Sequence, residues 1–437
     1  MSTGSCCGVT AGFGLAVSGI LRTMATIALS ELLGTPVLEP GGRAEGRVRE
    51  VAVCPQTDPA RICALVVKTR RGDCLLAAEK LTEVGSRAVQ VAVPSTEWPP
   101  FTSAEGLLLL GRDLLDQQII DVHGRKVVRV NDLDLHQEQV NHHPMLKIGD
   151  VDVGARAAVR RLLKGIVPAA ALHVLIQKLP ARVIPWEFVD LIETDPARRV
   201  KLKISHERLA KLHPADIADI VEELAPAERE AVFETLDEGV AAEALEEVTP
   251  KLQRSIVESL DSDRAADIVE EMDPDAAADL LADLPKEHSD KILEEMQPEE
   301  REEVSELLEF REDTAAGRMT TDYLALAPTA TVNDAIEALR KFEGGIESVS
   351  TIFLVDKDNK LVGAVPLASL VLASGDTPLS TLAPGLPISC LAGAREKEVA
   401  ELFDKYNLLM LPVVDDQGLL TGVITADDVI SLLRSKL

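Results

Sequence analysis

The sequence predicts an α+β chain of several domains, with a β-rich first part, an all-α repeat and a duplicated α/β module. Short apolar strands with Gly-containing turns recur from Leu29 to about Ile204. Eight twelve-residue blocks, each typical of one short helix, run from His213 to Leu308. A β-α-β-β-α pattern occurs twice after Met319. A chain of 437 residues, 46% of them hydrophobic, is long enough to bury about three domain cores.

The first residues carry no clear structural pattern. Residues 1–28 contain several glycines and no basic run, so a signal peptide or membrane anchor is disfavoured. We expect a disordered extension, or a start codon assigned too early with Met24 as the true start.

The β-rich part divides into two loosely similar segments, residues 29–94 and 105–204, joined by a proline-containing linker. Each has a short apolar strand, a Gly-containing turn, an alternating strand and a later hairpin, which predicts two small β-barrels. The stretches IIDVHGRKVVRVND and VIPWEFVDLI of the second segment resemble PRC-barrel domains, and the first segment matches more weakly. The resemblance implies a docking or assembly role without catalytic chemistry.

The second barrel is expected to hold a helical insertion at residues 151–181. Arg156, Arg160 and Lys164 are spaced four residues apart and would form one stripe of a helix. One interpretation is peripheral contact with an anionic membrane or an acidic protein. The other is an ordinary solvated helix face.

The twelve-residue blocks predict one short helix each, stacked around a shared core in a superhelix whose form the sequence does not fix. Positions 8 and 12 of every block are apolar, an i, i+4 pair that faces one way, and several blocks place proline in the first turn. The blocks contain 31 Asp and Glu against 7 Lys and Arg, a balance of −24 in a chain of net charge −28. Nearly all the acidity therefore belongs to the repeat.

Two acidic pairs are candidate metal ligands. Asp263 with Asp267, and Asp275 with Asp279, are i, i+4 pairs whose charges repel unless a cation neutralises them. Mg²⁺ uses one or two carboxylates and keeps several waters, whereas the His and Cys set expected for zinc is missing from the repeat. The alternative is that the carboxylates serve solubility and the helix dipoles.

Two stretches, KLHPADIADIVEEL and REDTAAGRMTTDYLAL, resemble the intracellular N domain of MgtE magnesium transporters and its junction with the next domain. We assign residues 205–312 to this domain. The resemblance implies that cations bridge acidic faces of the helical domain and the following domains, holding a compact form.

Residues 317–437 are expected to form a tandem pair of domains. The run LPVVDDQGLLTGVITADDVISLL resembles a CBS domain, and FLVDKDNKLVGAVPLASLVLA is a less regular second copy. Such pairs bind adenosine nucleotides, so Gly422, Thr425 and Asp428 are candidates for holding the ribose of ATP or AMP. The alternative is that Asp428 only caps the last helix. Asp376 lies where the MgtE family places an acidic residue facing the metal, and the resemblance also implies a homodimer through the CBS pair.

Several functions are disfavoured. A pI near 4.7 excludes the clustered cations that nucleic acid requires, and no stretch reaches the roughly 20 apolar residues of a spanning helix. No nucleophile–base pair or phosphate loop indicates an enzyme. Six cysteines without a C-x-x-C spacing are too sparse for a disulfide scaffold and favour a reducing cytoplasm.

Together these features predict a soluble cytoplasmic regulatory protein, peripheral to the membrane, that senses Mg²⁺ and modulates a metal transporter encoded as a separate chain. Two alternatives stay open. One is a sensor of adenine nucleotides, and the other is a scaffold built on the PRC-like barrels that senses nothing.

Overall fold

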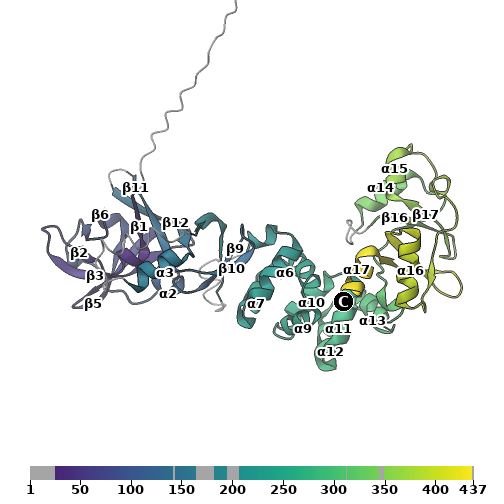
Figure 1. Cartoon of the computed structure of the whole chain (residues 1–437), viewed down its shortest axis with the longest axis horizontal. Helices are drawn as coiled ribbons and strands as arrows, with labels where there is room; N and C mark the ends of the chain where they lie inside the picture. The colour runs from purple at the N-terminus through teal and green to yellow at the C-terminus, as the bar shows by residue number, and fades with distance from the viewer. Residues whose placement is uncertain are drawn as a thin grey trace, which may run out of the picture. The chain divides into compact units, whose positions relative to one another are not determined.

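The computed structural model describes residues 25–140, 143–163, 182–193, 206–311, 313–342, 344 and 349–435. The described residues form two compact units (Figure 1). Unit 1 comprises residues within 25–118 and 128–189, and unit 2 comprises residues 119–127, 190–193 and those from 206 onward. Within the described ranges, no helix is both long enough and apolar enough to cross a membrane.

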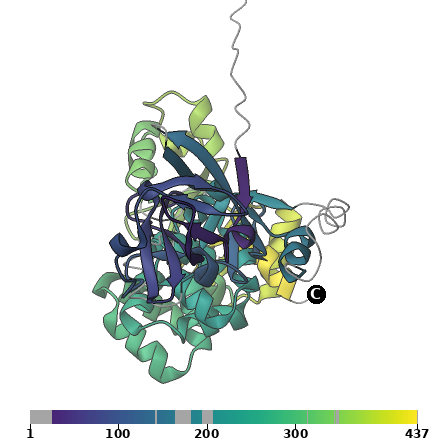
Figure 2. The ribbon, with the colours of Figure 1, turned by 90° about the vertical axis from the view of Figure 1, so that its left-hand side faces the viewer.

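Unit 1 is built on a seven-stranded sheet in the order β5-β4-β3-β2-β7-β6, with β8 paired to β3. The purple and blue strands of unit 1 face the viewer in Figure 2. The long hairpin of β3 and β4 buries consecutive aliphatic side chains, Val51–Val53 on one strand and Ala64–Val67 on the other, so both faces of the sheet are covered there. The strands are β2 (Pro36–Leu38), β3 (Ala44–Val53), β4 (Ile62–Thr69), β5 (Gly72–Ala77), β6 (Leu81–Val84), β7 (Val89–Val91) and β8 (Leu108–Leu109).

A second sheet of unit 1 has the order β1-β11-β12-β13. It consists of β1 (Ala25–Ala28), β11 (Asp132–Val140), β12 (His143–Asp152) and β13 (Val183–Pro185), and short helices α1 (Leu29–Leu32), α2 (Leu110–Asp113) and α3 (Ala155–Leu162) complete the unit.

These open sheets do not confirm the two closed barrels that the sequence predicts. β8, from the second predicted segment, pairs with β3 of the first. β1 lies inside the predicted N-terminal extension and pairs with β11. The strand partners therefore cross the expected boundaries.

A disulfide that the sequence did not predict joins Cys54, just after β3, to Cys63 in β4. The two Cα atoms are 6.0 Å apart, within the normal range for a disulfide.

Four aspartates of β11 and β12 face one another across the strands. Asp132 lies opposite Asp152, and Asp134 lies opposite Asp150. Directly opposed like charges are destabilising unless a cation neutralises them. Burial raises the pKa of both Asp134 and Asp152, so their charged forms are disfavoured in this cluster.

Helix α3 supplies the neutralising cations. The Arg160 guanidinium is 2.7 Å from the fully buried Asp132 carboxylate and 3.7 Å from Asp134, and the charge of Arg156 acts on Asp152. Arg160 is thus turned into the protein, which corrects both interpretations of the basic stripe, as a membrane or protein contact and as a solvated helix face. Lys164, with residues 164–181 of the predicted insertion, lies outside the described residues.

A small sheet, most of whose residues belong to unit 2, has the order β10-β9-β14 and is formed by β9 (Gln118–Asp121), β10 (Lys126–Arg129) and β14 (Val189–Leu191). Ile120 of β9 joins the buried core of the helical repeat. Arg125 donates to Asp216 at 2.9 Å, and the Glu223 carboxylate accepts from the Val127 amide at 2.9 Å. This sheet therefore continues into the repeat, although the sequence assigned its residues to the second barrel.

Each twelve-residue block forms one helix, as the sequence predicts. The helices are α6 (Pro214–Glu223), α7 (Pro226–Phe233), α8 (Glu238–Glu246), α9 (Pro250–Val257), α10 (Ser262–Glu270), α11 (Pro274–Asp283), α12 (Lys286–Glu295) and α13 (Pro298–Leu308). Alternate helices make the main contacts, so α6, α8, α10 and α12 form one layer and α7, α9, α11 and α13 form the other. The superhelix is therefore a zigzag of two layers.

Glutamates near the ends of α6, α8 and α10 connect the two layers of the repeat by hydrogen bonds. The carboxylates of Glu222, Glu246 and Glu270 accept hydrogen bonds from the backbone amides of Thr249, Asp273 and Gln297, each 27 residues further on. These amides lie at the N-caps of the later helices, where no intrahelical acceptor is available. Part of the acidity of the repeat thus serves the fold.

The C-terminal β-α-β-β-α duplication is confirmed. The first copy contains β15 (Ala325–Leu326), α14 (Val332–Arg340), β16 (Thr351–Val355), β17 (Leu361–Pro366) and α15 (Leu367–Leu372); the second contains β18 (Cys390–Leu391), α16 (Glu396–Tyr406), β19 (Met410–Val414), β20 (Leu420–Thr425) and α17 (Ala426–Ser435). In both copies the first strand runs parallel and the third antiparallel to the central strand, with a register shift at corresponding positions.

The second copy shares its core with the helical repeat. Val413, Ile424 and Val429 belong to the same buried cluster as the repeat side chains, whereas the first copy has a separate core. A smaller cluster, including Phe353 and Val423, joins the two copies. The start of α17 is consequently held against the repeat by packing.

We predict that Arg160→Met lowers the free energy of unfolding of unit 1 by about 3 kcal/mol, because it leaves a buried carboxylate without its cation. Urea denaturation monitored by tryptophan fluorescence measures the change. The matched control is Arg43→Met, since Arg43 is largely exposed and forms a surface ion pair with Glu45, and its effect should stay below about 1 kcal/mol. Equal effects of the two substitutions would contradict the role assigned to Arg160.

Candidate cation-binding face

Acidic side chains converge where the first turn of α11 meets the first turn of α17. Asp273 is the N-cap of α11 and Asp275 lies in its first turn, while Asp427 and Asp428 lie in the first turn of α17. Each pair suits its own helix, because the positive end of the helix dipole stabilises carboxylates there. The shared core brings the two pairs together, so charges favourable for each helix repel one another between helices.

Burial, and after it this repulsion, raises the pKa of three of these carboxyls. Burial, the charge of Asp428 and then that of Asp273 raise the pKa of Asp275 well above its usual value. Burial and the charges of Asp427 and Asp273 raise the pKa of Asp428 to about 6, against hydrogen bonds from Thr425 that lower it. Burial, followed by the charge of Asp427, also raises the pKa of Asp273. We call Asp273, Asp275, Asp427 and Asp428 the acidic face.

Helix α8 extends the acidic face. The Glu246 carboxylate accepts a hydrogen bond from the backbone amide of Asp273 at 2.7 Å. Burial and then the Asp273 charge raise the pKa of Glu246 to about 8, with smaller contributions from Glu243 and Glu247. Carboxylates from three helices are thus close enough to influence one another.

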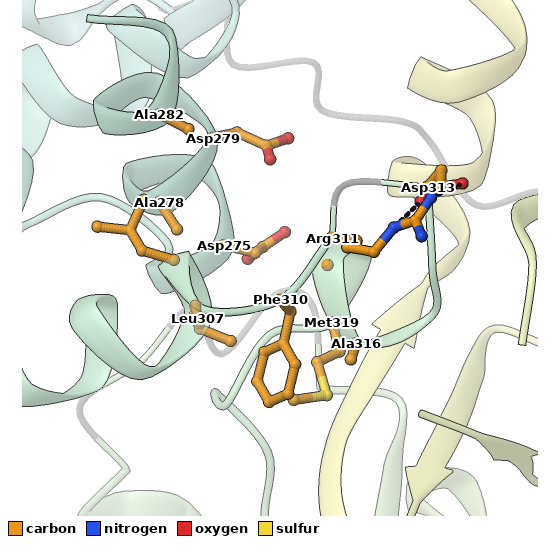
Figure 3. Close-up of a pocket in the computed structure, with 12 residues that line it drawn as sticks. Asp275, Ala278, Asp279, Ala282, Leu307, Phe310, Arg311, Asp313, Ala316 and Met319 are labelled. Carbon is orange, nitrogen blue, oxygen red and sulfur yellow. Dashed lines mark hydrogen bonds and ion pairs between the residues drawn. The ribbon is translucent and has the colours of Figure 1, made fainter. Parts of the chain in front are cut away.

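A pocket of about 420 Å³ opens beside the acidic face, between α11, the end of α13 and the segment that leads into the first CBS-like copy (Figure 3). The carboxylates of Asp275 and Asp279 point toward it, and the paired side chains of Arg311 and Asp313 lie across from them. Its remaining lining is mainly apolar: Ala278, Ala282, Leu307, Leu308, Phe310, Ala316, Gly317 and Met319.

Asp275 and Asp279 differ in their partners. Asp279 is 2.6 Å from the Arg318 guanidinium, which also lies 3.5 Å from Glu396 at the start of α16. In the part of the chain that the structure describes, no cationic side chain forms an ion pair with Asp275. Asp279 therefore has an internal counter-ion, whereas Asp275 does not.

The structure separates the acidic pairs that the sequence proposes as metal ligands. Asp275 and Asp279 share the pocket. Asp263 and Asp267 are exposed on α10, in the other layer of the repeat. Asp376 is exposed in the loop after α15. Among the described residues, no three acidic, His or Cys side chains already converge tightly enough to enclose an ion.

The proposed nucleotide residues have structural roles in this conformation. Thr425 is buried, and its hydroxyl and amide donate to Asp428 at 2.6 and 3.0 Å, so Asp428 caps the start of α17. Gly422 lies where Met319 and Thr320 pass close to β20, and a Cβ there would be only 2.6 Å from the Met319 sulfur. These contacts leave the binding of a nucleotide untested.

Sequence reasoning missed Asp273, Asp427 and Glu246. The available signals were the Asp273-Pro274-Asp275 run and the Ala426-Asp427-Asp428 run, which each place two acids at a helix start. The acids of α11 and α17 are more than 150 residues apart along the chain, and Glu246 lies 27 residues before Asp273. Local spacing does not predict contacts at either separation.

The helical repeat and the C-terminal pair are similar to domains of known families. The family model described as the MgtE intracellular N domain matches residues 212–313, and the CBS domain model matches residues 315–376 and 387–435. The magnesium transporter MgtE of Thermus thermophilus is 32% identical over 136 residues, and that of Enterococcus faecalis is 31% identical over 135 residues. Each alignment covers 31% of this chain and 30% of the relative, so the chain spans under a third of the length of these relatives.

Two solved structures extend the similarity to the fold. The soluble part of a magnesium transporter has a TM-score of 0.51 and 27% identity, covering 53% of this chain and 91% of that one. The cytosolic domain of the Mg²⁺ channel MgtE in complex with ATP has a TM-score of 0.50 and 30% identity, covering 53% and 94%. The part of this chain from residue 212 onward is thus similar to an MgtE N domain followed by a CBS pair.

We predict that Glu246→Gln stabilises unit 2 at high pH. The folded carboxyl has a pKa of about 8 against 4.5 as its ordinary value, so the folded state holds the proton more tightly and wild-type stability falls as pH rises from about 4.5 to 8. Glutamine keeps an oxygen acceptor for the Asp273 amide but carries no charge. The gain should be about 1 kcal/mol at pH 9 and near zero at pH 4, measured by urea denaturation.

The exposed Glu295 on α12 provides the control, because Glu295→Gln should leave the pH dependence of stability unchanged. If Glu246→Gln shifts stability equally at both pH values, the raised pKa does not control this effect.

Proposed function

We propose that this chain is a regulatory protein that binds Mg²⁺ at the acidic face and modulates a magnesium transporter in a membrane. The carrying observation is the meeting of α11 and α17 through carboxylates, of which Asp275 has no ion-paired cation in the described part of the chain. The similar proteins are magnesium transporters by name, and the solved cytosolic regions share this domain pair. We infer a binding role rather than a catalytic one.

The residues of the acidic face fit a hard divalent cation. All their donors are carboxylate oxygens, and the half-buried Asp275 has no cationic partner among the described side chains. Mg²⁺ is commonly held by one or two carboxylates and completes its shell with water, so an enclosed cluster is not required. Asp275 and Asp427, with Asp273 beside them, are the residues that would hold it.

Regulation follows from the position of this face between two domains. Asp275 belongs to the helical repeat and Asp427 to the second CBS-like copy, so a cation shared between them favours the arrangement in which both domains meet. Without a cation, repulsion between the charges raises the population of an arrangement with the helices apart. Bound cation shifts the population by its difference in affinity for the two arrangements.

We further propose that the transporter is a separate chain, that the protein acts at the cytoplasmic face of the membrane and that the CBS-like pair mediates a homodimer. The open sheets of unit 1 would provide a docking surface, in keeping with the PRC-barrel resemblance. Magnesium uptake by cells with and without this chain tests the regulatory role. An identical dependence of uptake on Mg²⁺ in both strains would contradict it.

Mg²⁺ should raise the melting temperature of unit 2 above that in KCl of the same ionic strength, because simple screening is then equal in both samples. At ten times the dissociation constant, binding adds about 1.4 kcal/mol, or roughly 3–6 °C. Scanning calorimetry measures the shift. A melting temperature that depends on ionic strength alone would contradict cation binding.

Asp275→Asn and Asp427→Asn should each reduce that shift by more than half, since each removes a proposed ligand. Asp263→Asn and Asp267→Asn are the matched controls, because these exposed acids belong to the other layer of the repeat. Loss of the shift in the controls, with retention in Asp275→Asn, would place the cation on α10 instead.

Adenine nucleotide is a second candidate ligand, because a similar cytosolic domain has been solved with ATP. Thr425 and Asp428 would have to exchange their mutual hydrogen bonds for bonds to the ribose. Calorimetric titration with ATP and AMP, with and without Mg²⁺, distinguishes this sensor from the magnesium sensor. No response to any of these ligands would leave the scaffold interpretation.

A further inference from the structure

Unit 1 contains a disulfide between Cys54 and Cys63 that has no part in the proposed binding of Mg²⁺. Cys54 and Cys63 close a loop of polar and proline residues between β3 and β4, with their Cα atoms 6.0 Å apart. Both residues are half-buried, so a small thiol or disulfide reagent can reach them from solvent. The loop folds on itself through the Cys54 carbonyl, which accepts from the amides of Thr57 and Asp58.

The loop also connects the two sheets of unit 1. The Ala60 carbonyl accepts from the Ile148 amide of β12 at 2.8 Å, and Arg61 forms an isolated antiparallel bridge with Lys147. Its ends belong to the seven-stranded sheet, whereas β12 belongs to the four-stranded sheet. Closing the loop covalently therefore restrains a contact between sheets.

The other described cysteines are poorly placed for this chemistry. Cys74 lies opposite Val67, four residues along β4 from Cys63 and thus roughly 13 Å away. Cys390 is buried in the other unit, and burial raises the pKa of its thiol to about 11, which disfavours the reactive thiolate. Within the described chain, Cys54 and Cys63 are thus the pair positioned to react with each other.

We propose that Cys54 and Cys63 are a reversible oxidation site that tightens the contact between the loop and β12. A low-molecular-weight disulfide such as glutathione disulfide is the oxidant. One cysteine thiolate attacks glutathione disulfide, which forms a mixed disulfide and releases one glutathione thiolate. The second cysteine thiolate then attacks the mixed disulfide at the first cysteine and displaces the remaining glutathione thiolate. The two cysteines lose two electrons and two protons in total, and glutathione disulfide is reduced to two glutathione molecules.

The experiment uses the full chain equilibrated in glutathione buffers from reducing to oxidising. Trypsin cleaves after Arg61, so the disulfide joins the peptide of residues 50–61 to that of residues 62–68, and mass spectrometry reports the linked fraction. The same samples are analysed for hydrogen exchange at the Ile148 amide and for melting temperature. Cys54→Ser and Cys63→Ser remove the link, and Cys74→Ser is the matched control.

We expect the linked peptides to form in oxidising buffer and to disappear at the cytosolic glutathione ratio. Oxidation should slow exchange of the Ile148 amide at least tenfold and raise the melting temperature of unit 1 by about 5 °C, in wild type and Cys74→Ser only. Linked peptides that never form, or that persist in reducing buffer, would overturn the proposal. Unchanged exchange at Ile148 would also overturn it, and none of these outcomes depends on Mg²⁺.

Discussion

Repulsion between the first turns of α11 and α17 is the interaction on which the account of unit 2 depends. Each turn accommodates its own aspartates, because a helix N-terminus attracts negative charge. The core that the repeat shares with the second CBS-like copy brings both turns together regardless, since Val413, Ile424 and Val429 are buried with the repeat side chains. Hydrophobic packing thereby maintains an electrostatic cost, which a bound cation would relieve.

At two other places, an arginine of the same molecule neutralises crowded carboxylates. In unit 1, Arg160 approaches Asp132 and Asp134, so the charge is balanced internally. On α11, Arg318 does the same for Asp279. Asp275 lies one helical turn away from Asp279 and has no such partner among the described residues. A surplus of carboxylates is therefore weak evidence for a cation site until the internal cations have been located.

Features with a local cause were predictable from the sequence. The twelve-residue period predicted all eight repeat helices, and the repeated β-α-β-β-α pattern predicted both C-terminal copies. Features that depend on distant partners were not predictable. The period does not show that alternate helices form layers, and helix spacing alone placed Arg160 in a solvent-facing stripe. The barrels were expected from strand texture, but β1 and β8 pair across the segment boundaries.

The most direct test is the number of protons released when Mg²⁺ binds. Carboxyls with raised pKa values, such as Asp428 at about 6, hold protons that a cation must displace. Titration calorimetry at pH 6 in two buffers of different ionisation enthalpy counts those protons. The account predicts measurable release at pH 6 that declines toward pH 9 and is reduced in Asp275→Asn. Binding of Mg²⁺ without proton release at pH 6 would contradict it.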